Sequence, residues 1–79
     1  MTVKLKIEKI SDAMQFINAA SKLKGNVWLS NETGCRVNGK SVLGVFDIAM
    51  KGDVFVEYTD TSEEFDELIK KLGEQTDEN

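Results

Sequence analysis

Two kinds of hydrophobic spacing alternate along this chain of 79 residues and restrict the folds open to it. Stretches in which every second residue is apolar predict strands with one buried face, and apolar residues three and four apart predict helices. Strands are expected over residues 2–7, 26–30, 35–37 and 53–58, and helices over residues 12–23, 41–50 and 61–72. Together they predict an α+β fold in the order βαββαβα, with three helices on one face of a four-stranded antiparallel sheet. The other sheet face is expected to be open to solvent.

The helix boundaries are predicted from capping residues. Asp12 is followed three residues later by Gln15, and Thr61 by Glu64, which is the spacing of a capping box in both cases. Asp12 and Thr61 are therefore expected to cap the first and last helices. Gly73 is expected to end the last helix.

Bulk properties restrict the class of protein. Residues 1–73 are expected to form one domain, and residues 74–79 a disordered polar tail. The net charge of −4 argues against direct nucleic-acid binding, and no apolar stretch approaches the roughly 18 residues of a membrane span.

The single cysteine, Cys35, permits no internal disulfide, which favours a cytoplasmic location. Its alternation with Val37 predicts a buried, unreactive thiol. Without histidine, we expect no metal site and no cofactor.

Three short segments resemble a known family. Residues 40–45 read Lys-Ser-Val-Leu-Gly-Val, residues 19–22 read Ala-Ala-Ser-Lys, and residues 51–53 read Lys-Gly-Asp before an alternating strand. In this order and spacing they resemble HPr, the phosphocarrier protein of the bacterial phosphoenolpyruvate-dependent sugar phosphotransferase system. The resemblance extends from Val3 to Leu72 and implies the HPr-like open-faced sandwich.

The chain departs from this family where the family carries its phosphoryl group, on a histidine in a Gly-x-His-Ala-Arg-Pro-Ala segment. Aligned through Ala13, Lys9 stands at the histidine, Ser11 at the arginine and Asp12 at the proline. A protonated lysine is not a nucleophile, and Asp12 would repel phosphate. The resemblance thus implies a non-catalytic, histidine-lacking, Crh-like variant, although Crh-like proteins keep the arginine and proline.

Ser41 matches the serine that a dedicated HPr kinase phosphorylates in this family. The phosphorylated protein then binds a transcription regulator of catabolite repression. A phosphoserine here would lie at a helix amino end, where free N–H groups and the helix dipole favour an anion. The alternative is that Ser41 only caps the helix, as serine does in many proteins.

The resemblance also implies a protein-docking face built from the start of the first helix and the short helix after Ser41. Val45 and Ile48 are expected to lie mainly in the core, and the alternative is that the other apolar residues of the short helix do so as well. The expected partner-binding residues are Lys9, Ser11, Asp12, Lys40, Val42, Leu43 and Phe46, with Met50 flanking them.

Trp28 and Phe55 are out of phase with their buried neighbours and are expected on the open sheet face. If the fourth strand lies between the first and second, as in HPr, the two rings come close together. They form either a cross-strand pair that shields the sheet or a second binding surface.

The resemblance to HPr and the missing histidine together predict a cytoplasmic regulatory protein of the phosphotransferase system. It is expected to work by binding proteins and to be switched through Ser41. Two alternatives remain open. One is a phosphocarrier component with a non-histidine acceptor, and the other is a relative that shares only the fold and binds an unrelated partner.

Overall fold

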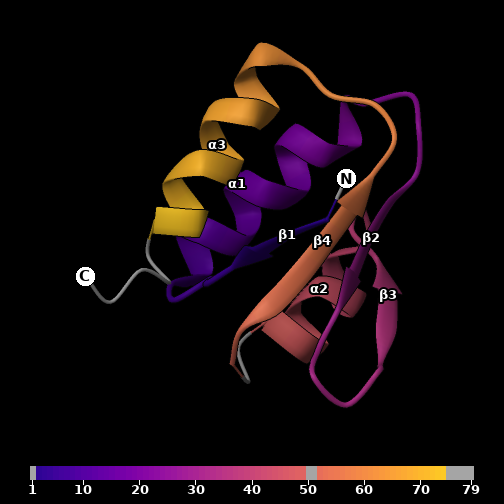
Figure 1. The fold of residues 1–79 in the computed structure, drawn as a ribbon, viewed down its shortest axis with the longest axis vertical. Helices are drawn as coiled ribbons and strands as arrows, with labels where there is room; N and C mark the ends of the chain where they lie inside the picture. Colours follow the sequence, from indigo (N-terminus) through magenta and orange to yellow (C-terminus); the bar gives the residue numbers. More distant parts are fainter. Residues whose placement is uncertain (1, 50–51, 75–79) are drawn as a thin grey trace.

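The computed structural model describes residues 2–49 and 52–74 of the chain. All seven predicted elements are present in the predicted order (Figure 1). Their bounds are β1 (Thr2–Leu5), α1 (Ile10–Ser21), β2 (Val27–Ser30), β3 (Arg36–Asn38), α2 (Val42–Ala49), β4 (Val54–Tyr58) and α3 (Glu63–Glu74). Met50, predicted in the short helix, and residues 75–79 of the predicted tail lie outside the described residues.

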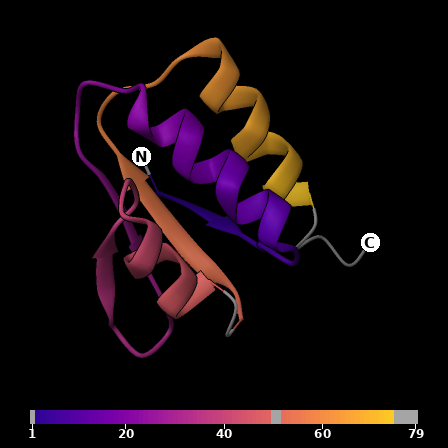
Figure 2. The same ribbon diagram turned by 180° about the vertical axis from the view of Figure 1, so that it is seen from behind.

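The strands form one antiparallel sheet in the order β1-β4-β2-β3. The fourth strand therefore lies between the first and second, as the resemblance implied. The three helices pack against one face of this sheet, and α1 lies between α2 and α3 (Figure 2). This arrangement confirms the predicted open-faced sandwich. It leaves the second sheet face uncovered.

The core fills the space between the sheet and the helices. Strand residues with inward parity, such as Leu5, Leu29 and Val56, are fully buried against the helices. The ring of Phe65 on α3 lies 5.8 Å from that of Phe16 on α1 and 5.1 Å from that of Tyr58 on β4. These aromatic contacts join two helices to the sheet.

Both predicted helix caps are wrong. Lys9, in an extended conformation, is the N-cap of α1 and provides no side-chain cap. Asp12 instead lies within the first turn, where a carboxylate is also favourable to the helix dipole. In α3, Ser62 Oγ accepts the Phe65 N–H at 3.1 Å, so Ser62 is the cap. Thr61 Oγ1 donates instead to Asp66 Oδ1 at 2.5 Å.

The predicted end of the last helix, at residue 72, is also two residues early. α3 continues through Gly73 to Glu74. The carbonyl of Leu72 accepts the Lys6 N–H at 3.3 Å, so this last turn is tied to the end of β1. A residue of the expected tail, Glu74, thus belongs to the helix.

Cys35 is exposed, which contradicts the prediction of a buried thiol. β3 begins only at Arg36, so the alternation does not extend back to the cysteine. Asn31 Oδ1 accepts the N–H groups of Thr33 and Cys35 at 3.1 and 3.0 Å. This side-chain acceptor holds Cys35 in the hairpin turn, away from the core.

Tyr58 should make stability depend on alkaline pH. Burial raises the pKa of its phenol above the ordinary value of 10.0, and the Asp66 carboxylate raises this pKa further. The unfolded chain loses the proton first, so the stabilisation is complete below about pH 10 and declines as the pH rises towards the folded pKa. Urea unfolding from pH 8 to 11 should show a steeper fall for the wild type than for Tyr58→Phe. Equal slopes would contradict this assignment.

Candidate functional site

Ser41 caps α2. Its Oγ accepts the Gly44 N–H at 3.2 Å, and its carbonyl accepts the Val45 N–H at 2.9 Å. A Cβ on Gly44 would lie 3.1 Å from Val37 Cβ and 3.4 Å from Ser41 Oγ. Glycine therefore lets α2 approach β3 closely. The serine is half-buried.

The two capping serines give a matched pair of stability predictions. Ser41 Oγ and Ser62 Oγ accept a backbone N–H at almost the same distance, 3.2 and 3.1 Å. Ser41→Ala and Ser62→Ala should each lower the free energy of unfolding by about 1 kcal/mol. Urea unfolding monitored by circular dichroism measures both. A neutral Ser41→Ala would contradict the cap in α2.

The large hydrophobic side chains exposed on the described part of the chain all lie on α1 and α2. Leu43 is 84% exposed and Val42 47%, both in the first turn of α2. Ile10 is 67% exposed and Met14 38%, one turn apart on α1. Because these two helices contact each other, the apolar surface lies on neighbouring elements. We call these four residues, with Ser41, the α1–α2 face.

The remaining residues of α2 follow the predicted division. Val45 and Ile48 are buried, which confirms that they belong to the core. Phe46 is half-buried and packs against the core. Ile10 and Met14 were not predicted as surface residues. Their i, i+4 spacing at the edge of the apolar stripe was the available signal.

The predicted charged residues do not converge on Ser41. Lys40 Nζ donates to the Leu23 carbonyl at 2.5 Å, beyond the carboxyl end of α1. Lys9 lies at the other end of α1, a helix of 12 residues and therefore about 18 Å long. Lys9 and Ser11 are exposed, whereas Asp12 is buried. The structure thus places Lys9, Ser11 and Asp12 together at the amino end of α1, and Lys40 beside its carboxyl end.

Trp28 and Phe55 both lie on the uncovered face of the sheet, half-buried, on neighbouring strands. They are diagonal neighbours, because Trp28 pairs with Glu57 and Phe55 with Ser30. The Arg36 guanidinium lies 4.5 Å from the Trp28 ring centroid, and its Nη2 lies 3.2 Å from Glu57 Oε1. Arg36 therefore covers part of the indole.

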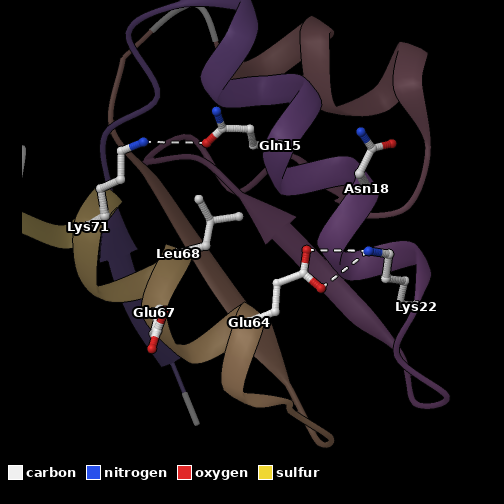
Figure 3. A pocket seen from close by; sticks show the side chains of 7 residues that line it. All are labelled: Gln15, Asn18, Lys22, Glu64, Glu67, Leu68 and Lys71. Carbon is white, nitrogen blue, oxygen red and sulfur yellow. Dashed lines mark hydrogen bonds and ion pairs between the residues drawn. The ribbon is translucent and has the colours of Figure 1, made fainter.

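An open groove of about 490 Å³ lies between α1 and α3 and was not predicted (Figure 3). Four of its seven lining side chains are paired across it. Lys22 Nζ lies 3.3 Å from Glu64 Oε1, and Lys71 Nζ donates to Gln15 Oε1 at 3.4 Å. The linked residues are 42 and 56 positions apart in sequence. Local sequence patterns could therefore not predict these contacts. The remaining lining residues are Asn18, Glu67 and Leu68.

Two further observations concern classes of site. Within residues 2–49 and 52–74, no three histidine, cysteine or acidic side chains gather in a way that could hold a metal ion. In the same ranges, no helix is both long and apolar enough to cross a membrane.

The fold belongs to a known class. No family model matches this chain, and no curated protein matches it in sequence. Among solved structures, it is similar to HPr-C-His from Thermoanaerobacter tengcongensis, with a TM-score of 0.67. The similarity covers 95% of this chain and 90% of that one, at 23% sequence identity. The chain therefore has an HPr-like fold.

Proposed function

We propose that this chain is a regulatory protein related to the phosphotransferase system, which binds partner proteins through the α1–α2 face and does not carry phosphoryl groups. The observation that carries this proposal is the location of Leu43, Val42, Ile10 and Met14, the exposed large hydrophobic residues of the described chain, on two neighbouring helices. Large apolar side chains exposed on neighbouring elements are typical of a protein-binding surface.

The absence of histidine supports the second half of the proposal. The residue that the HPr resemblance places at the phosphoryl-accepting position is Lys9, the N-cap of α1. A protonated amine lacks the lone pair that attacks a phosphoryl donor. The carboxylate of Asp12 in the same turn repels an incoming phosphate. Transfer of phosphoryl groups through this position is therefore disfavoured twice.

Ser41 is the proposed switch. Its hydroxyl group lies at the amino end of α2, where a phosphate would meet free N–H groups and the positive end of the helix dipole. The neighbouring Val42 and Leu43 are exposed. Phosphorylation would place roughly two negative charges beside these apolar side chains and change which partner they accept. The proposed partners are an HPr kinase and a transcription regulator of catabolite repression, in the cytoplasm.

The test is phosphorylation by ATP and purified HPr kinase, followed by peptide mapping. The proposal expects one phosphate on Ser41 in the wild type and in Ser62→Ala, and none in Ser41→Ala. Ser62→Ala is the matched control, because Ser62 is also a helix cap with a hydroxyl group bonded to a backbone N–H. Phosphate on both serines would indicate unspecific modification. No phosphate on the wild type would leave Ser41 as a cap alone and would contradict the switch.

A further inference from the structure

Lys40, which directly precedes the proposed switch residue Ser41, has its ammonium group bound at the end of another helix. Its Nζ atom donates to the Leu23 carbonyl at 2.5 Å, in a partly buried contact. Within residues 2–49 and 52–74, Lys40 forms no ion pair. Leu23 follows the C-cap of α1, Lys22. Lys40 therefore joins the segment that carries Ser41 to the end of α1.

This contact supplies a positive charge that the end of α1 otherwise lacks. The last turn of the helix contains no basic residue, and the ammonium group of its C-cap, Lys22, is paired with Glu64. A cation near a helix carboxyl end is favourable, and lysine side chains there donate to the last carbonyls. The Lys22 and Leu23 amides close the turn through bonds of 3.3 and 3.0 Å to helix carbonyls. Lys40 thus stabilises this turn from a different part of the chain.

The backbone that carries Lys40 and Ser41 does not depend on this side-chain contact. Asn38 Oδ1 accepts the Lys40 N–H at 2.9 Å, and the Asn38 carbonyl accepts the Ser41 N–H at 3.0 Å. Gly39 donates its N–H to the Val27 carbonyl at 2.7 Å, which ties the same turn to β2. The Lys40 ammonium can therefore leave its carbonyl partner while the turn keeps its position.

A phosphate on Ser41 would be a stronger acceptor for this ammonium than a carbonyl. Phosphoserine carries roughly two negative charges, whereas the carbonyl oxygen is neutral, and hydrogen bonds between charged groups are the strong ones. Consecutive Cα atoms lie about 3.8 Å apart, and the lysine charge is on a flexible four-carbon stem. Lys40 therefore reaches its neighbour without a movement of the backbone. Lys9, in contrast, lies at the far end of α1.

We propose that phosphorylation of Ser41 draws the Lys40 ammonium from the Leu23 carbonyl to the phosphate and thereby loosens the last turn of α1. This inference rests on the proposed function, because the phosphate is the one proposed for Ser41. It adds the structural response to that modification. The loosened turn ends at Lys22, whose pair with Glu64 spans the groove between α1 and α3 (Figure 3). The response therefore extends from α2 to that groove.

The experiment is NMR spectroscopy of the ¹³C,¹⁵N-labelled protein. The wild type and Lys40→Met, which keeps an aliphatic side chain without the charge, are each prepared with serine and with phosphoserine at position 41. The phosphoserine is incorporated during translation, so the result does not depend on a kinase. Lys24→Met is the matched control, because Lys24 is an exposed lysine next to Leu23 without an ion pair among the described residues. Circular dichroism verifies that every variant is folded.

The proposal expects the Leu23 carbonyl ¹³C shift of the phosphorylated wild type to equal that of unmodified Lys40→Met, since both lack the ammonium donor. Amide hydrogen exchange at Lys22 and Leu23 should become about two- to fivefold faster in both, as for loss of a cation at a helix carboxyl end. Phosphoserine should cause no further change in Lys40→Met and the full change in Lys24→Met.

Two results would overturn the proposal. One is a Leu23 carbonyl shift that phosphoserine leaves unchanged in the wild type. The other is an equal effect of phosphoserine in the wild type and in Lys40→Met, because the effect would then come from the field of the phosphate itself.

These outcomes separate the inference from the proposed function. An unchanged Leu23 carbonyl in a protein that HPr kinase phosphorylates on Ser41 would sustain the proposed switch and reject the response of α1. The expected Leu23 result in a protein that the kinase does not modify would support the response to phosphate and reject the switch.

Discussion

Phe65→Ala is expected to lower the free energy of unfolding by about 3–5 kcal/mol. Phe65 is fully buried, and its ring contacts both Phe16 and Tyr58. Truncation therefore leaves a cavity where two helices meet the sheet. Since a small domain is stable by only about 5–15 kcal/mol, this variant should be close to unfolding at room temperature. Urea unfolding followed by circular dichroism at 222 nm measures the change.

The matched control is Phe55→Ala. Phe55 has the same side chain but lies half-buried on the uncovered sheet face. Its loss should cost no more than about 1 kcal/mol, the range of a cross-strand pair. Equal losses in the two variants would mean that the open face contributes as much as the core, which would contradict the one-sided packing described above.

The second large effect is expected for docking. Leu43→Asp should raise the KM of HPr kinase for this protein at least about tenfold, because central apolar residues of interfaces contribute about 2 kcal/mol or more to binding. Leu43 is 84% exposed, so the free energy of unfolding should change by no more than about 0.5 kcal/mol. Steady-state kinetics with ATP in excess give the KM.

Thr59→Asp is the control for the added charge, because Thr59 is exposed in the loop between β4 and α3. It should leave the KM unchanged. If Thr59→Asp and Leu43→Asp raised the KM equally, the effect would come from net charge alone. An unchanged KM for Leu43→Asp would show that the kinase does not contact the α1–α2 face.

Strand phase was the most predictable property of this chain. The period of two in β2 and β4 placed Val27, Leu29 and Val56 inside and Trp28 and Phe55 outside, as the structure has them. The phase of a strand depends only on the alternation of apolar residues along it. It can therefore be predicted without knowing how the neighbouring elements pack. The cap of α2 was predictable for a similar reason, since Ser41 directly precedes a short apolar helix.

The predictions of the α3 cap and of the start of β3 were wrong because competing side chains or distant contacts determine these boundaries. Thr61 and Ser62 can both cap α3, and the sequence does not show that Asp66 engages the threonine hydroxyl. Cys35 leaves the strand because Asn31 binds its N–H. These choices depend on geometry that a periodic pattern does not contain.

The α1–α2 face was predictable only in part. Val42 and Leu43 were expected on it, because they follow Ser41 in the segment that resembles HPr. Ile10 and Met14 were missed, since their exposure depends on how α1 lies between α2 and α3. The buried, unpaired state of Asp12 was also not expected, because it follows from the tertiary packing of α1.

The central claim is that this HPr-like chain binds and is regulated but does not carry phosphoryl groups. Intact-mass spectrometry after incubation with phosphoenolpyruvate and the general phosphotransferase enzyme tests it most directly, with a histidine-containing HPr as the positive control. The account predicts that the control gains one phosphate and that this chain gains none. A phosphate on this chain, transferred onward to a sugar-specific component, would contradict the account and identify a carrier with a non-histidine acceptor.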